Sequence, residues 1–181
     1  ASILRGRILV HAAENARKAL KPDATDAERS AVHEKFQSAL EVLRRAQADP
    51  LNTQVIGKAM YLIGLCLLKL EDHAAALDQL RRTSRIYENT PEGLAAGIEV
   101  ADLLRELGQH DEAISAYAST LDGAGVSMTG EADNPWISAE QLRKRALEAY
   151  NFYLQRGEFS RASKVAAHLS PLVAPPRAAE L

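Results

Sequence analysis

The side chains that could do chemistry in this sequence lie mostly beside short breaks between apolar segments. Two carboxylate pairs, at residues 71–72 and 111–112, each adjoin a histidine, His73 and His110. Paired carboxylates next to imidazole could act in acid–base catalysis or hold a metal ion. Acids also collect at helix N-termini, where free N–H groups and the helix dipole attract negative charge. That explanation suffices, so we predict a turn-packing role for both histidines.

The only cysteine and one glycine-containing loop are the other chemical candidates. Cys66 lies within an apolar segment, which favours a buried structural thiol over a nucleophile and excludes an internal disulfide. The stretch GAGVSMTG, residues 123–130, is superficially similar to a phosphate-binding loop, but it follows a helical pattern and has the wrong spacing. The sequence carries no zinc-protease, CxxC or nucleophile-elbow motif. We therefore predict no enzyme, no metal and no cofactor.

Composition and charge narrow the class of protein further. The 181 residues are 46% hydrophobic, 25% charged and only 5% aromatic, as expected for a globular helical protein. Residues 51–136 carry 6 basic and 13 acidic side chains, which argues against a nucleic-acid partner. No apolar run approaches the roughly 18 residues of a membrane span. Because the chain begins with alanine rather than methionine, we expect a processed form or a piece of a longer protein.

Apolar periodicity and helix-breaking residues predict eight helices and no sheet. Thr25 with Glu28, and Ser138 with Gln141, form capping-box patterns at two of the helix starts. A polar loop is expected at 122–135 and a proline-containing, flexible tail at 171–181. The expected helices span about 3–20, 25–48, 52–70, 73–89, 92–107, 111–121, 138–156 and 159–169.

Three of the helix pairs align with one another. Residues 61–80 match 98–117, 37 residues later, and these match 147–166 after a further 49 residues. Small residues recur in these columns, and a turn residue lies between the two helices of each pair. The aligned columns are Gly64/Ala101/Tyr150, Leu67/Leu104/Tyr153, Glu71/Gly108/Gly157, His73/His110/Phe159, Ala76/Ala113/Ala162 and Leu80/Tyr117/Ala166.

This pattern resembles the tetratricopeptide repeat, most closely in LLRELGQHDEAISAY, residues 103–117. The resemblance implies an all-α, right-handed superhelical array of antiparallel helix pairs, an α-solenoid. It covers residues 50–170 well, as pairs at 50–91, 92–121 and 136–170, and residues 1–49 only as a degenerate hairpin. In such a hairpin we expect Gly64 to face Ala76 at the closest helix approach. Tyr150 departs from the pattern and predicts a wider or shifted contact in the third pair.

The resemblance also implies a function and a site. Proteins of this family bind an extended peptide or a helix in a concave groove lined by the first helix of each pair. No carboxylate-clamp pattern of Lys and Asn is present. The groove positions carried onto this sequence are Lys58, Tyr61, Leu65, Lys69, Ile98, Asp102, Arg105, Lys144, Leu147, Asn151 and Gln155.

Two further hypotheses stay open. The stretch from Tyr87 to Pro91 looks like the Y-x-x-x-P junction in repeats of bacterial envelope proteins, which favours an assembly scaffold in the envelope over the cytoplasm. Alternatively, a small molecule or glycan could bind through stacking residues, for which the sequence offers Tyr61, Trp136, Tyr150 and Tyr153. The open ends of the array could also pair to give a homodimer.

Overall fold

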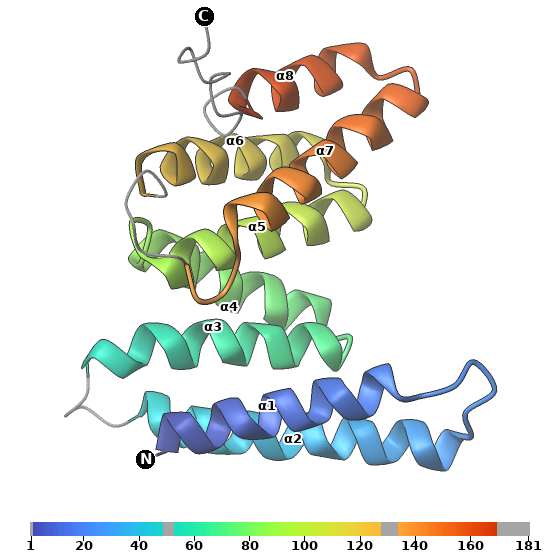
Figure 1. The fold of residues 1–181 in the computed structure, drawn as a ribbon, viewed down its shortest axis with the longest axis vertical. Coiled ribbons are helices and arrows are strands. Elements are labelled where there is room, and N and C mark those ends of the chain that lie inside the picture. Colours follow the sequence, from blue (N-terminus) through green and yellow to red (C-terminus); the bar gives the residue numbers. More distant parts are fainter. Residues whose placement is uncertain (1, 49–52, 128–133, 170–181) are drawn as a thin grey trace, which may run out of the picture. The chain divides into compact units, whose positions relative to one another are not determined.

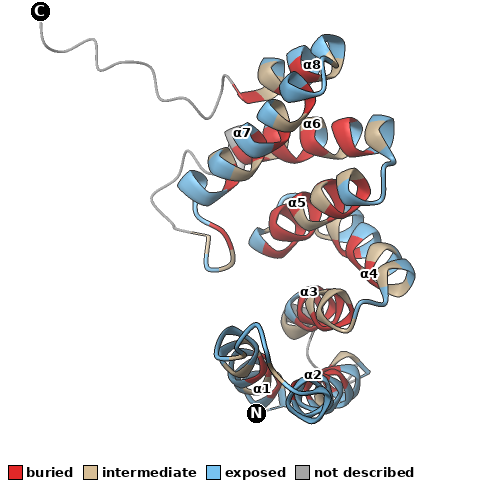
Figure 2. Cartoon of the chain, turned by 90° about the vertical axis from the view of Figure 1, so that its right-hand side faces the viewer, coloured by how far each residue is buried: buried red, intermediate tan, exposed pale blue. Residues whose placement is uncertain are grey.

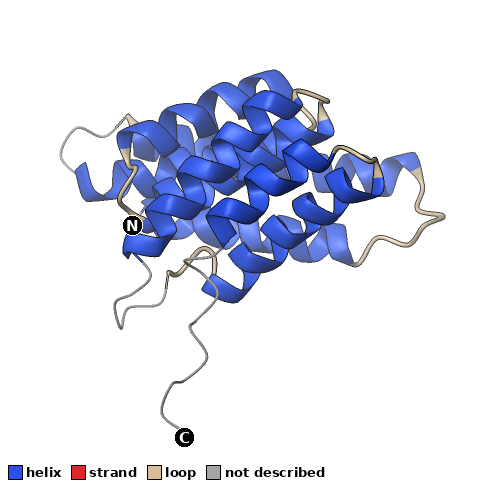
Figure 3. Ribbon diagram, turned by 90° about the horizontal axis from the view of Figure 1, so that it is seen from above, coloured by secondary structure: helices blue, strands red, loops and turns tan. Residues whose placement is uncertain are grey.

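The computed structural model describes residues 2–48, 53–127 and 134–169. These residues form eight helices and no strand, as Figures 1 and 3 show, so the all-α class is confirmed. None of the described helices is both long and apolar enough to span a membrane. The helices are α1 (Ser2–Lys18), α2 (Asp26–Gln47), α3 (Thr53–Lys69), α4 (His73–Ile86), α5 (Pro91–Glu106), α6 (His110–Ser127), α7 (Ala139–Gln155) and α8 (Phe159–Leu169).

The chain forms two compact units, residues 1–83 and 84–181. The division falls within α4, whereas the sequence analysis placed its boundary after residue 49. In the first unit α1 packs against α2 and α3, and α2 also packs against α3. In α1 and α2 the buried residues, coloured red in Figure 2, lie on one side of the helix, whereas most of the described side chains of α3 are buried. The core of this unit includes Val10, Ala13, Phe36, Leu43, Cys66 and Leu80.

In the second unit α5 packs against α6, and α8 packs against both α7 and α6. α5 lies deepest, and most of its residues are buried. Its N-terminus is fixed by Thr90, whose hydroxyl accepts a hydrogen bond from Gly93 N, and by Pro91 at the first position. A Cβ at Gly93 would overlap the carbonyl oxygen of Tyr87. The segment from Tyr87 to Pro91 therefore turns so tightly that its first carbonyl leaves space only for glycine at position 93.

Local signals in the sequence account well for the helix starts. Both predicted capping boxes are present, with reciprocal side-chain and backbone bonds between Thr25 and Glu28 and between Ser138 and Gln141. The two hydrogen bonds from Thr25, through its backbone N–H first and its hydroxyl second, lower the pKa of the exposed Glu28 carboxyl. Each box satisfies N–H groups that the first helical turn leaves without a partner.

Three helix-to-helix turns share one backbone geometry. Glu71, Gly108 and Gly157 all have positive φ angles, of 61°, 75° and 72°. In each turn the following residue donates its N–H to the carbonyl five positions earlier, as in Gln109 to Leu104 at 2.9 Å. This is the Schellman arrangement, which ends a helix through one left-handed residue. The three turns occupy the aligned column, so the repeat is present in the backbone of the described residues as well as in the sequence.

The contact at Gly64 differs from the prediction. The atoms nearest to a Cβ built on Gly64 belong to Leu80, at 2.5 Å and 2.6 Å, rather than to Ala76. Leu80 lies one helical turn after Ala76 and is completely buried, so the glycine leaves room for this large side chain. Gly6 and Leu43 repeat this relationship between α1 and α2, since a Cβ built on Gly6 would lie 2.5 Å from Leu43 Cδ2.

The third pair and the predicted loop also differ in detail. Tyr150 is only half-buried, while Ala146 and Ala149 are buried on the core side of α7. α6 continues to Ser127, six residues beyond the predicted end at 121. Burial of Leu121 and Ala124 outweighs the helix cost of Gly123, which is about 1 kcal/mol. The rest of the predicted loop, 128–133, and the tail, 171–181, lie outside the described residues.

Candidate functional site

The predicted residues of α7 share one solvent-facing side of that helix. Lys144, Leu147, Asn151 and Gln155 are all exposed and follow the spacing i, i+3, i+7 and i+11. Leu147 keeps 43% of its surface exposed. The opposite side of the helix carries the buried residues Leu142, Ala146, Ala149 and Tyr153. We refer to the four exposed residues as the α7 face.

The predicted residues of α5 are placed differently. Ile98 is completely buried, so it belongs to the core and cannot contact a partner, which corrects its assignment to a binding surface. Asp102 and Arg105 keep only 17% and 18% of their side-chain surface exposed. Both are engaged by side chains of the same unit. The sequence pattern could not show that the polar groups on this side of α5 are already occupied.

Asp102 is the centre of a polar network between α5, α6 and α7. Its Oδ2 accepts a hydrogen bond from Arg145 Nε at 2.6 Å, and its Oδ1 accepts one from the Tyr117 hydroxyl. Arg145 also donates to Glu99 Oε1 at 2.7 Å. Arg105 Nε donates to the Tyr117 hydroxyl at 3.0 Å. These bonds join three helices through partly buried charges, which stabilises their packing when all partners are present.

The pKa values of the network follow from burial and charge. Burial raises the pKa of Tyr117, and the negative charge and hydrogen bond of Asp102 raise it further. Burial alone would lower the pKa of Arg145, but the bonds and charges of Glu99 and Asp102 outweigh burial and raise it. Tyr117 therefore stays neutral and Arg145 stays charged over the physiological range. Sequence analysis missed Arg145 and Glu99, because their partners lie more than 40 residues away in the chain.

The predicted residues of α3 belong to the first unit. Lys58 is exposed, and Leu65 and Lys69 are half-buried, so these three occupy the most solvent-accessible side of α3. Tyr61 keeps only 4% of its surface exposed and lies in the core. As with Ile98, its burial corrects its assignment to the binding surface.

An aromatic cluster occupies the end of the polar network. The ring of Phe152 has the guanidinium carbons of Arg105 and Arg156 at 5.3 Å and 5.2 Å from its centre. His110 packs against Phe152 and, edge to face, against Tyr153, with ring centres 5.7 Å and 5.5 Å apart. This supports the predicted packing role of His110. Tyr153 is completely buried, so it is not accessible to a stacking ligand.

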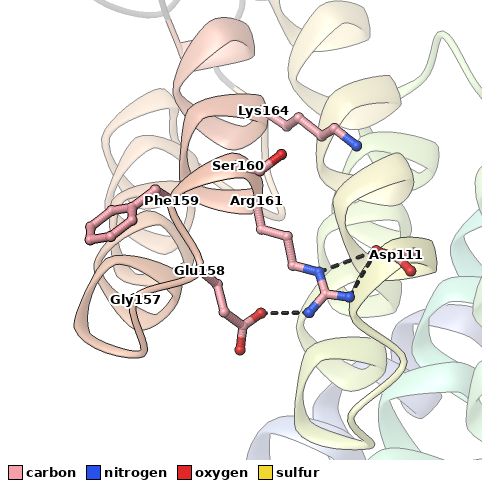
Figure 4. A pocket seen from close by; sticks show the side chains of 7 residues that line it. All are labelled: Asp111, Gly157, Glu158, Phe159, Ser160, Arg161 and Lys164. Atoms are coloured by element: carbon pink, nitrogen blue, oxygen red, sulfur yellow. Dashed lines mark hydrogen bonds and ion pairs between the residues drawn. The ribbon is translucent and has the colours of Figure 1, made fainter.

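Two open depressions lie between α6 and α8. The first, of about 430 Å³, lies beside the α7–α8 turn (Figure 4). Arg161 crosses it and pairs with Asp111 at 3.0 Å and with Glu158 at 2.5 Å. The second, of about 320 Å³, is next to the pair formed by His168 and Asp122, 2.8 Å apart. In the first depression the charge of Arg161 is therefore balanced by Asp111 and Glu158. Asp111 and Lys164 line both depressions.

The described residues contain no group of three His, Cys, Asp or Glu side chains close enough to hold a metal ion. Cys66 is fully buried, and burial, followed by the charge of Glu14, raises the pKa of its thiol to about 12. Among the predicted site residues, the four of the α7 face are all exposed. Comparison with protein-family models and with curated proteins finds no match to this chain.

Proposed function

We propose that this chain is a non-catalytic, tetratricopeptide-like repeat module that binds a protein or peptide on the α7 face. The observation that carries the proposal is the exposure of that face. Leu147 lies between polar neighbours at helical spacing, while the polar side chains of α5 are used internally. A partner segment would bury Leu147 and orient itself through Lys144, Asn151 and Gln155.

The common turn geometry at Glu71, Gly108 and Gly157 supports the repeat assignment. Repeat arrays present one helix of each pair on a shared surface, which suits extended partners. Lys58, Leu65 and Lys69 are the corresponding surface of the first unit. Ile98 and Tyr61 are left out of the proposed surface, because both are buried.

Co-purification from lysate of the source organism, with identification by mass spectrometry, tests this proposal. The test variant combines Lys144→Glu with Leu147→Asp. A matched control combines Lys164→Glu with Leu107→Asp, because Leu107 is 44% exposed and Lys164 is exposed elsewhere in the same unit. We expect a protein that the parent and the control enrich and that the test variant loses. Equal recovery by all three chains would show that the α7 face does not bind it.

The envelope scaffold is the alternative within this proposal. The segment from Tyr87 to Pro91 that suggested it also has a local role, since it forms the tight turn before α5. Identification of the co-purified partner as an envelope protein would favour the scaffold, and a cytoplasmic partner would exclude it.

A further inference from the structure

The outward side of α1 combines exposed apolar side chains with mostly positive charge. Leu4 and Ile8 keep 62% and 58% of their surfaces exposed, among the highest values for large apolar residues in the described chain. They are one helical turn apart. The buried residues Gly6 and Val10 each lie two positions further along. Two residues correspond to about 200° of rotation, so the apolar pair faces directly away from the packed side.

Basic side chains border this apolar stripe on both sides. At 100° per residue, Arg7, His11 and Lys18 lie along one edge of the stripe, and Arg5 lies along the other. All four are exposed. The stripe with its borders is about 20 Å long.

Acidic charge is scarce on this side of α1. Among residues 2–18 the single acid is Glu14, which is half-buried and close enough to Cys66 to raise the pKa of its thiol. At 100° per residue Glu14 lies beside Arg7, at the outer edge of the basic border. The face therefore carries the permanent positive charges of Arg5, Arg7 and Lys18 against one carboxylate.

We propose that the face of α1 formed by Leu4, Ile8 and their basic borders docks onto an anionic lipid surface. Helices that lie in a membrane interface insert apolar side chains while Lys and Arg along the borders contact acidic headgroups. Long arginine side chains can extend to the headgroups as Leu4 and Ile8 enter the acyl boundary. To bury Leu4 and Ile8, an acidic protein would need a pocket fitted to these two side chains. A lipid surface needs no such pocket and can accept the apolar stripe and its positive charges as they are.

The observations disfavour a second copy of the same face as the occupant. Two α1 faces placed against each other would bring together eight basic groups if histidines are protonated, against one Glu14 carboxylate from each copy. Two large apolar side chains per copy are also far fewer than the 20–30 residues a side of a stable protein interface. A surface with many mobile negative charges fits better.

Co-sedimentation of the full chain with vesicles tests the proposal. One vesicle type contains phosphatidylcholine alone, and the other contains phosphatidylcholine mixed with phosphatidylglycerol. We expect binding to the anionic vesicles only, and we expect it to weaken as salt is added. Leu4→Ser with Ile8→Ser should reduce the partition coefficient at least about tenfold, and Arg5→Gln with Arg7→Gln about as much.

Matched controls carry the same exchanges elsewhere. Ile86→Ser with Leu107→Ser alters side chains that are 56% and 44% exposed, and Arg44→Gln with Arg82→Gln removes two exposed cations. Both controls should bind anionic vesicles as the parent does, and circular dichroism should show that all variants are folded. Absence of parental binding to anionic vesicles, or equal binding by the α1 variants, would overturn the proposal. So would a dimer in solution that the Leu4 and Ile8 exchanges dissociate without any lipid binding.

Discussion

Leu80 of α4 occupies the space in which a side chain at Gly64 of α3 would lie. A Cβ at Gly64 would come within 2.5 Å of Leu80 Cδ2, and Leu80 is completely buried. Since real Cβ atoms do not approach other atoms so closely, Leu80 or one of the two helices must shift if the glycine is replaced. Glycine at position 64 thus lowers the helix propensity of α3 but allows Leu80 to be fully buried.

Gly64→Ala should lower the free energy of unfolding by about 1–2 kcal/mol, because overpacking outweighs the gain in helix propensity. In a Leu80→Ala background the same exchange should be neutral or stabilising, since the clash is gone. Urea unfolding of the four chains gives the coupling between the sites. Gly123→Ala is the control, because among the described atoms a Cβ at Gly123 would meet Leu94 alone, at 3.4 Å. This exchange should stabilise the chain by up to about 1 kcal/mol. Equal effects of Gly64→Ala in both backgrounds would contradict this account.

Glu71 holds a left-handed conformation that its two equivalents, Gly108 and Gly157, adopt without strain. Glu71→Gly should therefore raise the free energy of unfolding by about 1 kcal/mol. The reverse exchange, Gly108→Ala, should lower it by a similar amount. No atom lies within 4 Å of a Cβ at Gly108, so its cost comes from the backbone alone.

Thermal or urea unfolding of both variants checks this prediction. Glu106→Gly serves as the control, because it makes the same exchange at an exposed residue in the last turn of α5. That variant should lose stability, because its backbone is right-handed and helical. If Glu71→Gly also lost stability, strain at Glu71 would not be the reason for its conformation.

The helix pairs could be predicted because their signals are local. Capping boxes, the turn column and apolar spacing each act within a few residues, and the structure contains all of them. Gly64 was singled out correctly, but its neighbour was not, because Ala76 and Leu80 lie on the same side of α4. Which of the two meets the glycine depends on how the helices are aligned along their length, and sequence spacing does not fix that alignment.

The exposure of the candidate surface was predictable only where it depends on the residue pattern of a single helix. The residues of the α7 face are exposed because the other side of α7 is apolar. Asp102 and Arg105 had the same spacing, yet Arg145 and Tyr117 occupy them from other helices. Ile98 is buried because α5 is covered on most of its circumference. Such coverage is a property of the assembled unit.

Arg145 should be important for the stability of the second unit. Arg145→Gln leaves Glu99 without its cation and Asp102 with Arg105 alone, 3.5 Å away, and should lower the free energy of unfolding by about 2–3 kcal/mol. Arg145→Lys should cost less, about 1–2 kcal/mol, since an ammonium group cannot bind both carboxylates in a fixed fork. The neighbouring exposed cation supplies the control, and Lys144→Gln should change stability by no more than about 0.5 kcal/mol. Urea unfolding measures all three, and similar losses for Arg145→Gln and Lys144→Gln would show that the network contributes little.

The buried thiol of Cys66 predicts how the first unit responds to alkaline pH. Its pKa of about 12 in the folded chain lies above the ordinary value of 9.0, so the folded state keeps a proton that the unfolded state releases. The contribution to stability is therefore complete below pH 9 and falls as pH rises from there toward 12. The slope in that window is about 1.4 kcal/mol per pH unit.

Urea unfolding at pH 8 and at pH 10 tests this slope. The interval includes the pH at which the thiol of the unfolded chain loses its proton, and it ends where tyrosines begin to titrate. Cys66→Ala costs some stability at both pH values, because it removes buried sulfur, but it should lose about 1 kcal/mol less than the parent between them. The folded parent should also resist iodoacetamide at pH 8 and become reactive on unfolding, because the thiolate is the nucleophile. Equal losses in parent and variant, or rapid alkylation of the folded chain, would mean that the thiol titrates normally and is not held in the core as the structure shows.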